Sequence, residues 1–359
     1  MAFVTFDVTK LKLNFDYLNN LFDENGIKWS IVTKMLSGNK IFLTEVLKLD
    51  IGQICDSRVS NLKNIKALRP DVETIYIKPP AKRAIKGVVR YADISLNTEL
   101  ETIKMLSEEA QNQNKVHKII IMMELGELRE GVNREDFIAF YESVFQQKNI
   151  EVVGIGANLT CLYGVLPNRD KLIQLTLYKQ IIEAKFNKRL PYVSGGSSVT
   201  IPLIFQKLLP EGINHFRVGE TLYLGTDVYY DKPLANMCNN IFMLYSEIIE
   251  VIEKPTVPEG TMGTNLEGNT FTFETQDIGQ TSIRAIIDIG LLDVEIKHLE
   301  FVDNDISIVG ASSDVIVIDL GENKKDYKVG ELIEFRLDYM GTLRIINSKY
   351  IDKRIINIE

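Results

Sequence analysis

The sequence predicts an α/β fold, in which a (β/α)8 TIM barrel is followed by a mostly β C-terminal domain. Three observations lead to this prediction. Eight short β-rich runs alternate with helical patterns through the first two-thirds of the chain. These runs are apolar without strict alternation, as in parallel strands that are buried on both faces. After residue 232, helical periodicity weakens and short strand-like runs take over.

The expected barrel strands are short runs rich in β-branched and aromatic residues, and segments with helical periodicity separate most of them. They lie at 29–34, 53–57, 74–78, 92–96, 118–125, 151–159, 192–196 and 215–219. Between the fifth and sixth strands, four apolar residues of 137–144 recur at i, i+3, i+4 and i+7, the spacing of one helix face. Eight strands favour a closed barrel over an open doubly wound sheet.

The second domain is expected to begin where turn residues become frequent. We expect the barrel to span residues 1–232 and the β domain residues 233–359. A turn-rich segment, "KPTVPEGTMGTNLEGNT", lies early in the second domain. Four strand-like runs follow it, at 282–290, 306–320, 331–339 and 342–351.

Composition narrows the class of protein. The 359 residues are 45% hydrophobic and 25% charged, which is ordinary for a globular protein that buries a sizeable core. A net charge of −8 argues against nucleic-acid binding, which needs clustered lysine and arginine. No apolar run approaches the ~18 residues that span a bilayer, and no signal peptide is visible. Three widely spaced cysteines suggest a reducing cytoplasm and show no zinc spacing.

Polar residues follow several expected strands, at the barrel face where active sites form. Lys34 is the last residue of the first expected strand. The glycine- and serine-rich 194–198 comes at the end of the seventh and opens a helix, which suits an anion. Loops after strands 7 and 8 are the usual phosphate position in this fold. A lysine opposite a phosphate site suggests pyridoxal phosphate, whose aldehyde needs an amine nucleophile. The alternative is that Lys34 is a surface lysine that caps a barrel strand.

These residues resemble the alanine racemase-like, fold type III pyridoxal-phosphate enzymes. The stretch "FVTFDVTKLKLNFDYLNNLF…IKWSIVTK" is similar to the start of that family, in which a lysine, here Lys34, ends strand 1. "FRVGETLYLG" resembles the family's Arg-Pro-Gly segment. The resemblance implies that Arg217 meets the pyridine nitrogen and that the backbone of Gly219 and Glu220 meets the phosphate. "SGGSS" resembles the phosphate-binding serine segment, with Ser197 the first match and Ser198 the next.

Further similar segments extend the resemblance over nearly the whole chain. "MMELGELREGV" implies that Arg129 lies near the phenolic oxygen of the cofactor, and Asn158 stands where alanine racemase has a ring-stacking histidine. "GASSDVIVIDL" implies that Ser313 binds the substrate carboxylate from the other subunit, and "GTLRIINSKYIDKR" implies that Tyr350 binds phosphate. A head-to-tail homodimer with shared sites is therefore expected. The variants "TK…SGN", "DSR" and "GIGANLTC" are most similar to the ornithine racemase subgroup.

The resemblance implies a racemase, which needs two proton carriers on opposite faces of one planar carbanion. Lys34 serves one face. The second base of the family is a tyrosine, but Met262 stands at about that position here. Cys161 is our candidate, because a thiolate acts as a base when its pKa is lowered; a buried structural cysteine is the alternative. Three tyrosines are further candidates, namely Tyr163, Tyr192 and Tyr245.

Three functions compete at this point. The first is racemisation of a basic amino acid such as ornithine. The second is a non-catalytic pyridoxal-phosphate homeostasis protein, which the missing tyrosine favours and the complete β domain opposes. The third is a fold type III decarboxylase, although those chains usually run longer. A carboxylate of "MELGELRE" is a candidate to meet a substrate ammonium. The three histidines lack metal spacing and are expected to be structural or solvated; they are His117, His215 and His298.

Overall fold

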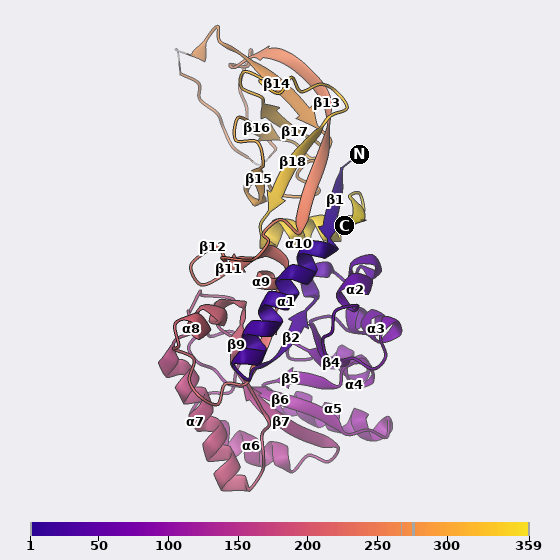
Figure 1. The fold of residues 1–359 in the computed structure, drawn as a ribbon, viewed down its shortest axis with the longest axis vertical. Coiled ribbons are helices and arrows are strands. Elements are labelled where there is room, and N and C mark those ends of the chain that lie inside the picture. Colours follow the sequence, from indigo (N-terminus) through magenta and orange to yellow (C-terminus); the bar gives the residue numbers. More distant parts are fainter. Residues whose placement is uncertain (1, 267, 275–276, 358–359) are drawn as a thin grey trace. The chain divides into compact units, whose positions relative to one another are not determined.

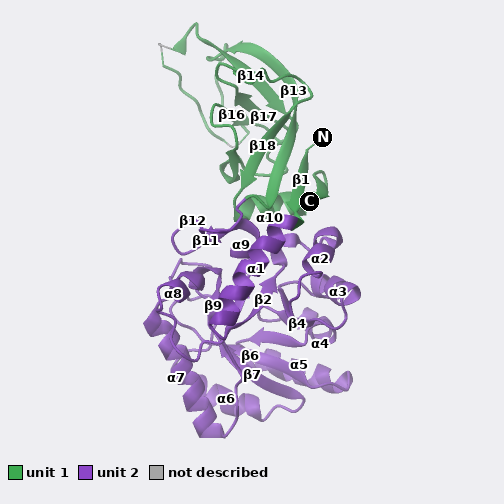
Figure 2. Cartoon of the chain, viewed as in Figure 1, with its two compact units in different colours: residues 1–8, 240–359 green, residues 9–239 purple. Residues whose placement is uncertain are grey.

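The computed structural model describes residues 2–266, 268–274 and 277–357, which form two compact units (Figures 1 and 2). Residues 9–239 form the first, called the barrel unit here, and residues 1–8 with 240–359 form the second, called the β unit. This grouping differs from the division expected between residues 232 and 233. The first eight residues group with the β unit because the strand that they contain pairs only with strands of that unit.

The barrel unit contains a parallel sheet, as the sequence predicts. Its order is β8-β7-β6-β5-β4-β3-β2-β10-β9. The strands are β2 (Lys28–Val32), β3 (Gln53–Asp56), β4 (Glu73–Tyr76), β5 (Ile94–Asn97), β6 (His117–Met122), β7 (Ile150–Gly156), β8 (Tyr192–Ser194), β9 (Gly196–Ser197) and β10 (His215–Val218). The expected strand 192–196 is thus split into β8, which pairs with β7, and β9, which pairs with β10. Both edges of the sheet meet in this one stretch of chain, so the barrel prediction is confirmed.

Helices alternate with these strands. They are α1 (Val8–Glu24), α2 (Lys40–Val46), α3 (Val59–Leu68), α4 (Ile85–Tyr91), α5 (Leu100–Asn112), α6 (Phe137–Phe145), α7 (Arg169–Phe186), α8 (Ile201–Phe205) and α9 (Glu220–Leu224), with short 3-10 helices η1 (Lys34–Leu36), η2 (Lys82–Ala84) and η3 (Ser198–Thr200) and a small hairpin of β11 (Thr226–Asp227) and β12 (Lys232–Pro233). The expected face of α6 packs inward through buried Phe137, Tyr141 and Val144. Branched and other apolar side chains from neighbouring strands form one buried cluster, which includes Val32, Cys55 and Met122.

The β unit is mostly antiparallel, and its main sheet has the order β15-β18-β13-β14-β17-β16. Its elements are β1 (Phe3–Asp7), β13 (Phe242–Pro255), β14 (Thr281–Ile287), η5 (Ile296–His298), β15 (Leu299–Phe301), β16 (Ser307–Ala311), β17 (Ile316–Asp319), β18 (Leu332–Leu337), α10 (Tyr339–Asn347) and β19 (Asp352–Ile356). Strand β1 lies between β13, to which it is antiparallel, and β19, to which it is parallel. The prediction of a mostly β second domain is confirmed.

The prediction of one strand in this unit is wrong. Residues 342–351 were expected to be strand-like, but α10 occupies residues 339–347. The Asp338 side chain caps the helix by accepting the Gly341 N–H at 2.7 Å. The buried residues Gly341, Thr342, Ile345 and Ile346 recur with helical spacing, so this apolar pattern belongs to a helix face.

The sequence also missed β13, the longest strand of the β unit. A register shift between Ile248 and Glu250 interrupts its pairing with β14. Such a bulge breaks the two-residue alternation by which a half-buried strand is recognised. This bulge explains why the sequence of residues 242–255 does not show the alternating pattern of a single strand.

Candidate active site

The candidate lysine lies on a short loop after β2. The strand ends at Val32, and Lys34 begins η1, so the expectation that the lysine itself ends the strand is wrong by two residues. Lys34 is exposed, whereas its neighbours Thr33 and Met35 are buried. The loop therefore presents Lys34 at the C-terminal side of the barrel while the side chains before and after it are anchored.

Arg217 lies on β10, directly beside β2, and is only 6% exposed. Its Nη1 donates to the Ser194 carbonyl at 2.9 Å and to the Ser194 hydroxyl. Its Nη2 donates to the Ala157 carbonyl at 3.0 Å and to Asn158 Oδ1 at 2.6 Å. Burial lowers the pKa of Arg217, but a guanidinium keeps its charge in proteins. The barrel thus holds a fixed cation at the ends of β7, β8 and β10.

A chain of polar contacts joins Arg217 to Arg129. Asn158 accepts from Arg217 and donates to a Glu130 carboxylate oxygen. Arg129 Nη2 donates to the same oxygen at 2.5 Å. Glu130 is the main reason why the pKa of Arg129 is raised. The structure therefore brings together Arg217, Asn158 and Arg129, and it adds Glu130, which the sequence offered only as one of several acidic residues.

The loops after β9 and β10 lie side by side. Arg217 and Ser197 are cross-strand neighbours in the parallel pair. Ser197 caps η3, and the Ser198 hydroxyl accepts the backbone N–H of Thr221 at 3.2 Å. Gly219 precedes the first turn of α9, and a Cβ there would lie 2.9 Å from the carbonyl oxygen of Val32. These contacts bring Ser197, Ser198, Gly219 and Glu220 to the same end of the barrel.

The glycines of "SGGSS" have a packing role that the sequence did not indicate. A Cβ on Gly196 would overlap the ring of Phe216 on the adjacent strand. One on Gly195 would lie 3.0 Å from Ile213. The Phe216 ring therefore already requires glycine at 196 without a bound anion, whereas the space at Gly195 is only tight.

Cys161 lies in an exposed loop after β7, so the alternative of a buried structural cysteine is wrong. The carboxylate of buried Glu127 holds this loop by accepting the backbone N–H groups of Leu162, Tyr163 (3.1 Å) and Val165 (3.0 Å). Burial raises the pKa of Glu127, but these N–H groups outweigh that effect and lower it. Cys55, in contrast, is fully buried in the barrel, and burial raises its pKa to about 12.

The carboxylates of "MELGELRE" are already engaged by the protein. Glu124 accepts the N–H groups of Gly126 (2.5 Å) and Leu128 (3.0 Å). Glu127 holds the 160–165 loop, and Glu130 joins Arg129 to Asn158. These contacts assign the three carboxylates to local structure, which weakens the hypothesis that one of them meets a substrate ammonium.

The tyrosine candidates are dispersed. Tyr192 begins β8, and its hydroxyl accepts from Gln53 at the start of β3, so it lies at the opposite end of the strands from Lys34. Tyr163 is exposed beside Cys161, and Tyr245 lies on β13 of the β unit, stacked on Phe3.

Two other predicted site residues, Ser313 and Tyr350, belong to the β unit. Tyr350 is 77% exposed, and the Ser313 hydroxyl donates to Asp314 at 2.8 Å. The roles of Ser313 and Tyr350 stay predictions. Met262, at about the position of the family's tyrosine, is exposed in the same unit.

A neutral histidine lies beneath the buried cation. His215 Nδ1 lies 2.6 Å from the Ser194 hydroxyl, and its Nε2 lies 3.0 Å from both the Ser30 hydroxyl and Gln53 Oε1. Burial lowers the pKa of His215 to about 3, with Arg217 adding to the effect. His117 is also buried, bonds Ser95 at 2.8 Å and has its pKa lowered to about 4. His298 bonds Asp338 at 2.7 Å.

The two buried histidines predict a loss of stability in acid. Each stays neutral in the folded state well below pH 6.5, whereas an unfolded histidine takes up a proton there. The unfolded state therefore binds more protons, and the free energy of unfolding should fall by about 2 kcal/mol per histidine between pH 7 and 5. Urea unfolding at both pH values measures this loss, and His215→Asn should remove about half of it. An unchanged loss in that variant would contradict the assignment.

Within the described residues, no group of three or more histidine, cysteine, aspartate or glutamate side chains is placed to hold a metal ion. No helix in that part of the chain has the length and apolar character to cross a membrane.

Sequence comparisons give a consistent picture. A family model described as "Alanine racemase, N-terminal domain" matches residues 6–227. The chain is 38% identical over 354 residues to an ornithine racemase of Acetoanaerobium sticklandii, with 98% of this chain and 99% of that protein covered. It is 31% identical over 328 residues to a lysine racemase of Thermotoga maritima, with 91% of each covered.

Solved structures agree on the fold. An alanine racemase from Bartonella henselae, described with covalently bound pyridoxal phosphate, is similar with a TM-score of 0.73 and 17% identity over 99% of both chains. An alanine racemase from Streptomyces coelicolor has a TM-score of 0.74 and 12% identity, and the match covers 100% of this chain and 98% of that one.

Proposed function

The chain belongs to the alanine racemase N-terminal domain family, and from this premise we propose that it is an amino-acid racemase that uses pyridoxal 5′-phosphate and acts on a basic amino acid such as ornithine. The observation that carries the proposal is the pairing of β2 with β10 in parallel, with Ser30 opposite Arg217. This pairing brings the two most specific sequence matches, Lys34 and Arg217, to the same end of adjacent strands.

The residues at this end of the barrel fit the cofactor. Pyridoxal phosphate needs an amine for its aldehyde, hydrogen-bond donors for its phosphate and a partner for its pyridine nitrogen. Lys34 offers an exposed amine, Ser197 and Ser198 offer hydroxyls, and Arg217 offers a fixed guanidinium. Gly219 keeps the backbone beside Val32 clear of a side chain. We assign the phosphate to the loops of Ser197, Ser198, Gly219 and Glu220.

Different residues of the chain have different roles in the proposed racemisation. When bound, the cofactor supplies an electron sink for negative charge at the substrate α-carbon. The Lys34 amine takes or gives the α-proton on one face. Arg217 would meet the pyridine nitrogen of the cofactor, and its positive charge would disfavour protonation of that nitrogen. Asn158 and Glu130 keep Arg217 and Arg129 in fixed positions through the contacts described above.

We assign the proton transfer on the opposite face to Cys161. The cysteine is exposed in the loop after β7, three residues beyond Asn158, which contacts Arg217. The thiolate is the form of a cysteine that acts as a base. Cys161→Ser should therefore lower kcat by roughly 10²-fold or more. Cys238→Ser, a change of the same size at a half-buried cysteine outside the site, is the control.

We further propose a head-to-tail homodimer in a reducing cytoplasm. The three cysteines are all free thiols in the structure, as a reducing compartment would keep them. In the dimer Ser313 would bind the substrate carboxylate in the partner's site, and Tyr350 would bind the phosphate. Sedimentation of the purified protein tests the dimer, and loss of activity in Tyr350→Phe tests that second role.

The function is tested by following enantiomers directly. Purified protein with pyridoxal phosphate is incubated with L-ornithine, L-lysine or L-alanine, and the D-enantiomer is quantified by chiral chromatography. Formation of D-ornithine or D-lysine, with incorporation of deuterium at the α-carbon in heavy water, is expected. Release of carbon dioxide would instead reveal a decarboxylase. Binding of the cofactor without deuterium incorporation would reveal a non-catalytic protein.

Gly219→Ala is expected to weaken cofactor binding by roughly 10-fold or more. The added Cβ would meet the backbone oxygen and Cβ of Val32, neither of which can move without shifting β2. Equilibrium dialysis with pyridoxal phosphate measures the change. Gly52→Ala is the matched control, because a Cβ at Gly52 meets nothing within 4 Å. Equal affinities in the two variants would argue against the phosphate assignment.

A further inference from the structure

The loop that carries Lys34 is held by the segment that follows the next strand. Parallel pairing of β2 with β3 runs through Ile31–Ile54 and Val32–Cys55, so Thr33 and Asp56 come next in register. The Thr33 hydroxyl donates to Asp56 Oδ2 at 2.8 Å, and the Thr33 backbone N–H donates to the Cys55 carbonyl at 2.8 Å. The Thr33 hydroxyl also lies 3.1 Å from the Cys55 carbonyl oxygen, so the residue immediately before Lys34 is fixed through both its backbone and its side chain.

Asp56 is itself immobilised. The carboxylate is fully buried, and its Oδ1 accepts the backbone N–H of Arg58 at 2.9 Å and the Asn61 side-chain amide at 3.1 Å. Arg58 caps α3, and Asn61 lies in its first turn. Two donors from the start of α3 therefore orient the carboxylate that accepts from Thr33.

The far side of the loop is held by the same helix. Gly38 has a φ of 73°, and a Cβ there would overlap the Asn61 side chain. Asn64 Nδ2 donates to the Gly38 carbonyl at 3.1 Å. Met35 and Leu36 between these anchors are buried. The motifs "TK…SGN" and "DSR" thus describe two segments that fit together, and Lys34 is the exposed residue of the first.

We propose that Thr33, Asp56 and Asn61, called the lysine clamp here, are positioning residues that hold Lys34 in its reactive position. The inference rests on the proposed racemase function. Thr33 is the chain neighbour of Lys34, so any rotation of its backbone displaces the lysine Cα. Misplacing a catalytic group by about 1 Å costs on the order of 10²-fold in rate. The clamp prevents this displacement without touching substrate or cofactor.

Replacement of the Thr33 hydroxyl tests the clamp. Thr33→Val keeps the shape of the side chain and removes the donor, whereas Thr33→Ser keeps the donor. The valine variant is expected to lose roughly 10- to 100-fold in kcat while KM changes less than about 3-fold. The serine variant should stay within about 3-fold of wild type. Asn61→Ala, which removes another donor to Asp56, should reproduce the kcat loss if the valine variant fails to fold.

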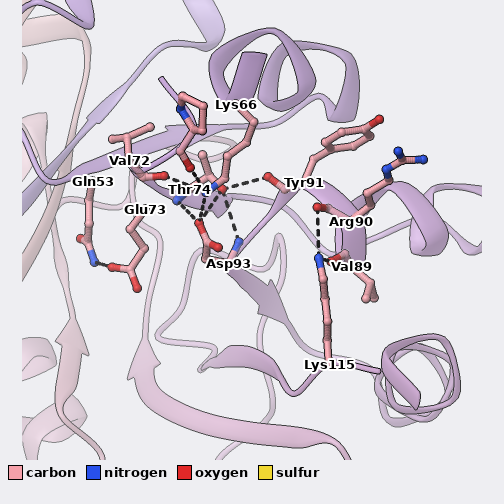
Figure 3. Close-up of polar contacts among 11 residues, drawn as sticks. Gln53, Lys66, Val72, Glu73, Thr74, Val89, Arg90, Tyr91, Asp93 and Lys115 are labelled. Atoms are coloured by element: carbon pink, nitrogen blue, oxygen red, sulfur yellow. Dashed lines mark hydrogen bonds and ion pairs between the residues drawn. The ribbon is translucent and has the colours of Figure 1, made fainter. Parts of the chain in front are cut away.

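Thr74 offers a matched control at the other end of a barrel strand. Figure 3 shows its hydroxyl, which donates to the Tyr91 carbonyl at 2.8 Å and to Asp93 Oδ2 at 3.0 Å. Asp93 also accepts from Lys66 at 2.7 Å. Thr74→Val therefore removes a comparable hydroxyl–carboxylate contact far from Lys34. It should lower the unfolding temperature and leave kcat unchanged.

Hydrogen exchange gives a readout that needs no turnover. In cofactor-free protein, amides of residues 34–38 should exchange at least about 10-fold faster in Thr33→Val than in wild type or Thr74→Val. Equal exchange and equal kcat in the two valine variants would overturn the clamp, even if wild type racemises ornithine. Absence of racemisation in wild type would overturn the proposed function, and faster exchange at 34–38 would then still show that the clamp orders the loop.

Discussion

Lys34→Ala is expected to abolish racemisation, with a loss of roughly 10⁴-fold or more in kcat. The variant lacks both the amine that the cofactor aldehyde requires and the proton carrier on one substrate face. Wild type mixed with pyridoxal phosphate should show a visible absorption band that borohydride bleaches. The alanine variant should lack that band. Chiral chromatography and the absorption spectrum therefore measure the two losses separately.

Lys40→Ala is the control for this experiment. Lys40 is another exposed lysine, six residues further along the chain at the start of α2. Its replacement should leave the spectrum and kcat as in wild type. A bleachable band that persists in Lys34→Ala would show that another amine holds the cofactor, and Lys34 would then be the cap of an ordinary barrel strand.

Arg217→Lys is expected to have the second largest effect. Two nitrogens of the guanidinium donate to Ser194, Ala157 and Asn158. A lysine has a single nitrogen, which cannot reach all of these acceptors. Each buried acceptor left without a donor costs about 1–3 kcal/mol. The free energy of unfolding of the cofactor-free protein should fall by about 2–4 kcal/mol, and kcat by roughly 10²-fold because Asn158 and Glu130 lose their anchor.

Urea unfolding and steady-state kinetics measure these two effects. Arg90→Lys makes the same change at an exposed arginine beside Tyr91 and should alter neither quantity. If Arg217→Lys kept wild-type stability and kcat, the network from Arg217 to Arg129 would have no role in the fold or the reaction.

The barrel was predictable because its strands carry a local signal. Each of the eight expected runs overlaps a strand of the parallel sheet, since burial on both faces demands a continuous apolar stretch. The β unit was less predictable, because its sheet is assembled from distant segments. A bulge interrupts the alternating pattern of β13, and a capped helix lies where a strand was expected at 342–351.

The candidate site was also predictable only in part. Lys34, Arg217, Ser197 and Gly219 lie at or just after the C-terminal ends of strands, so the location of active sites in barrels was enough to predict that they share one end. The sequence did not indicate that Glu130 and Asp56 bridge other side chains, because such a carboxylate has no spacing signature of its own. Their importance lies in contacts across strands, which become visible only when the register of β2 with β3 and the loops after β6 and β7 are known.

The pairing of β1 with β13 and β19 has a consequence for the order of folding. Residues 3–7 leave the ribosome before the barrel unit, whereas their parallel partner at 352–356 leaves it after every other strand. The barrel unit, made of contiguous chain, can fold while synthesis continues. The β unit must wait for its last strand and close a loop of more than 300 residues, so its contacts have high sequence separation and form slowly. Refolding from urea should therefore occur in two phases, with the β unit accounting for the slower one.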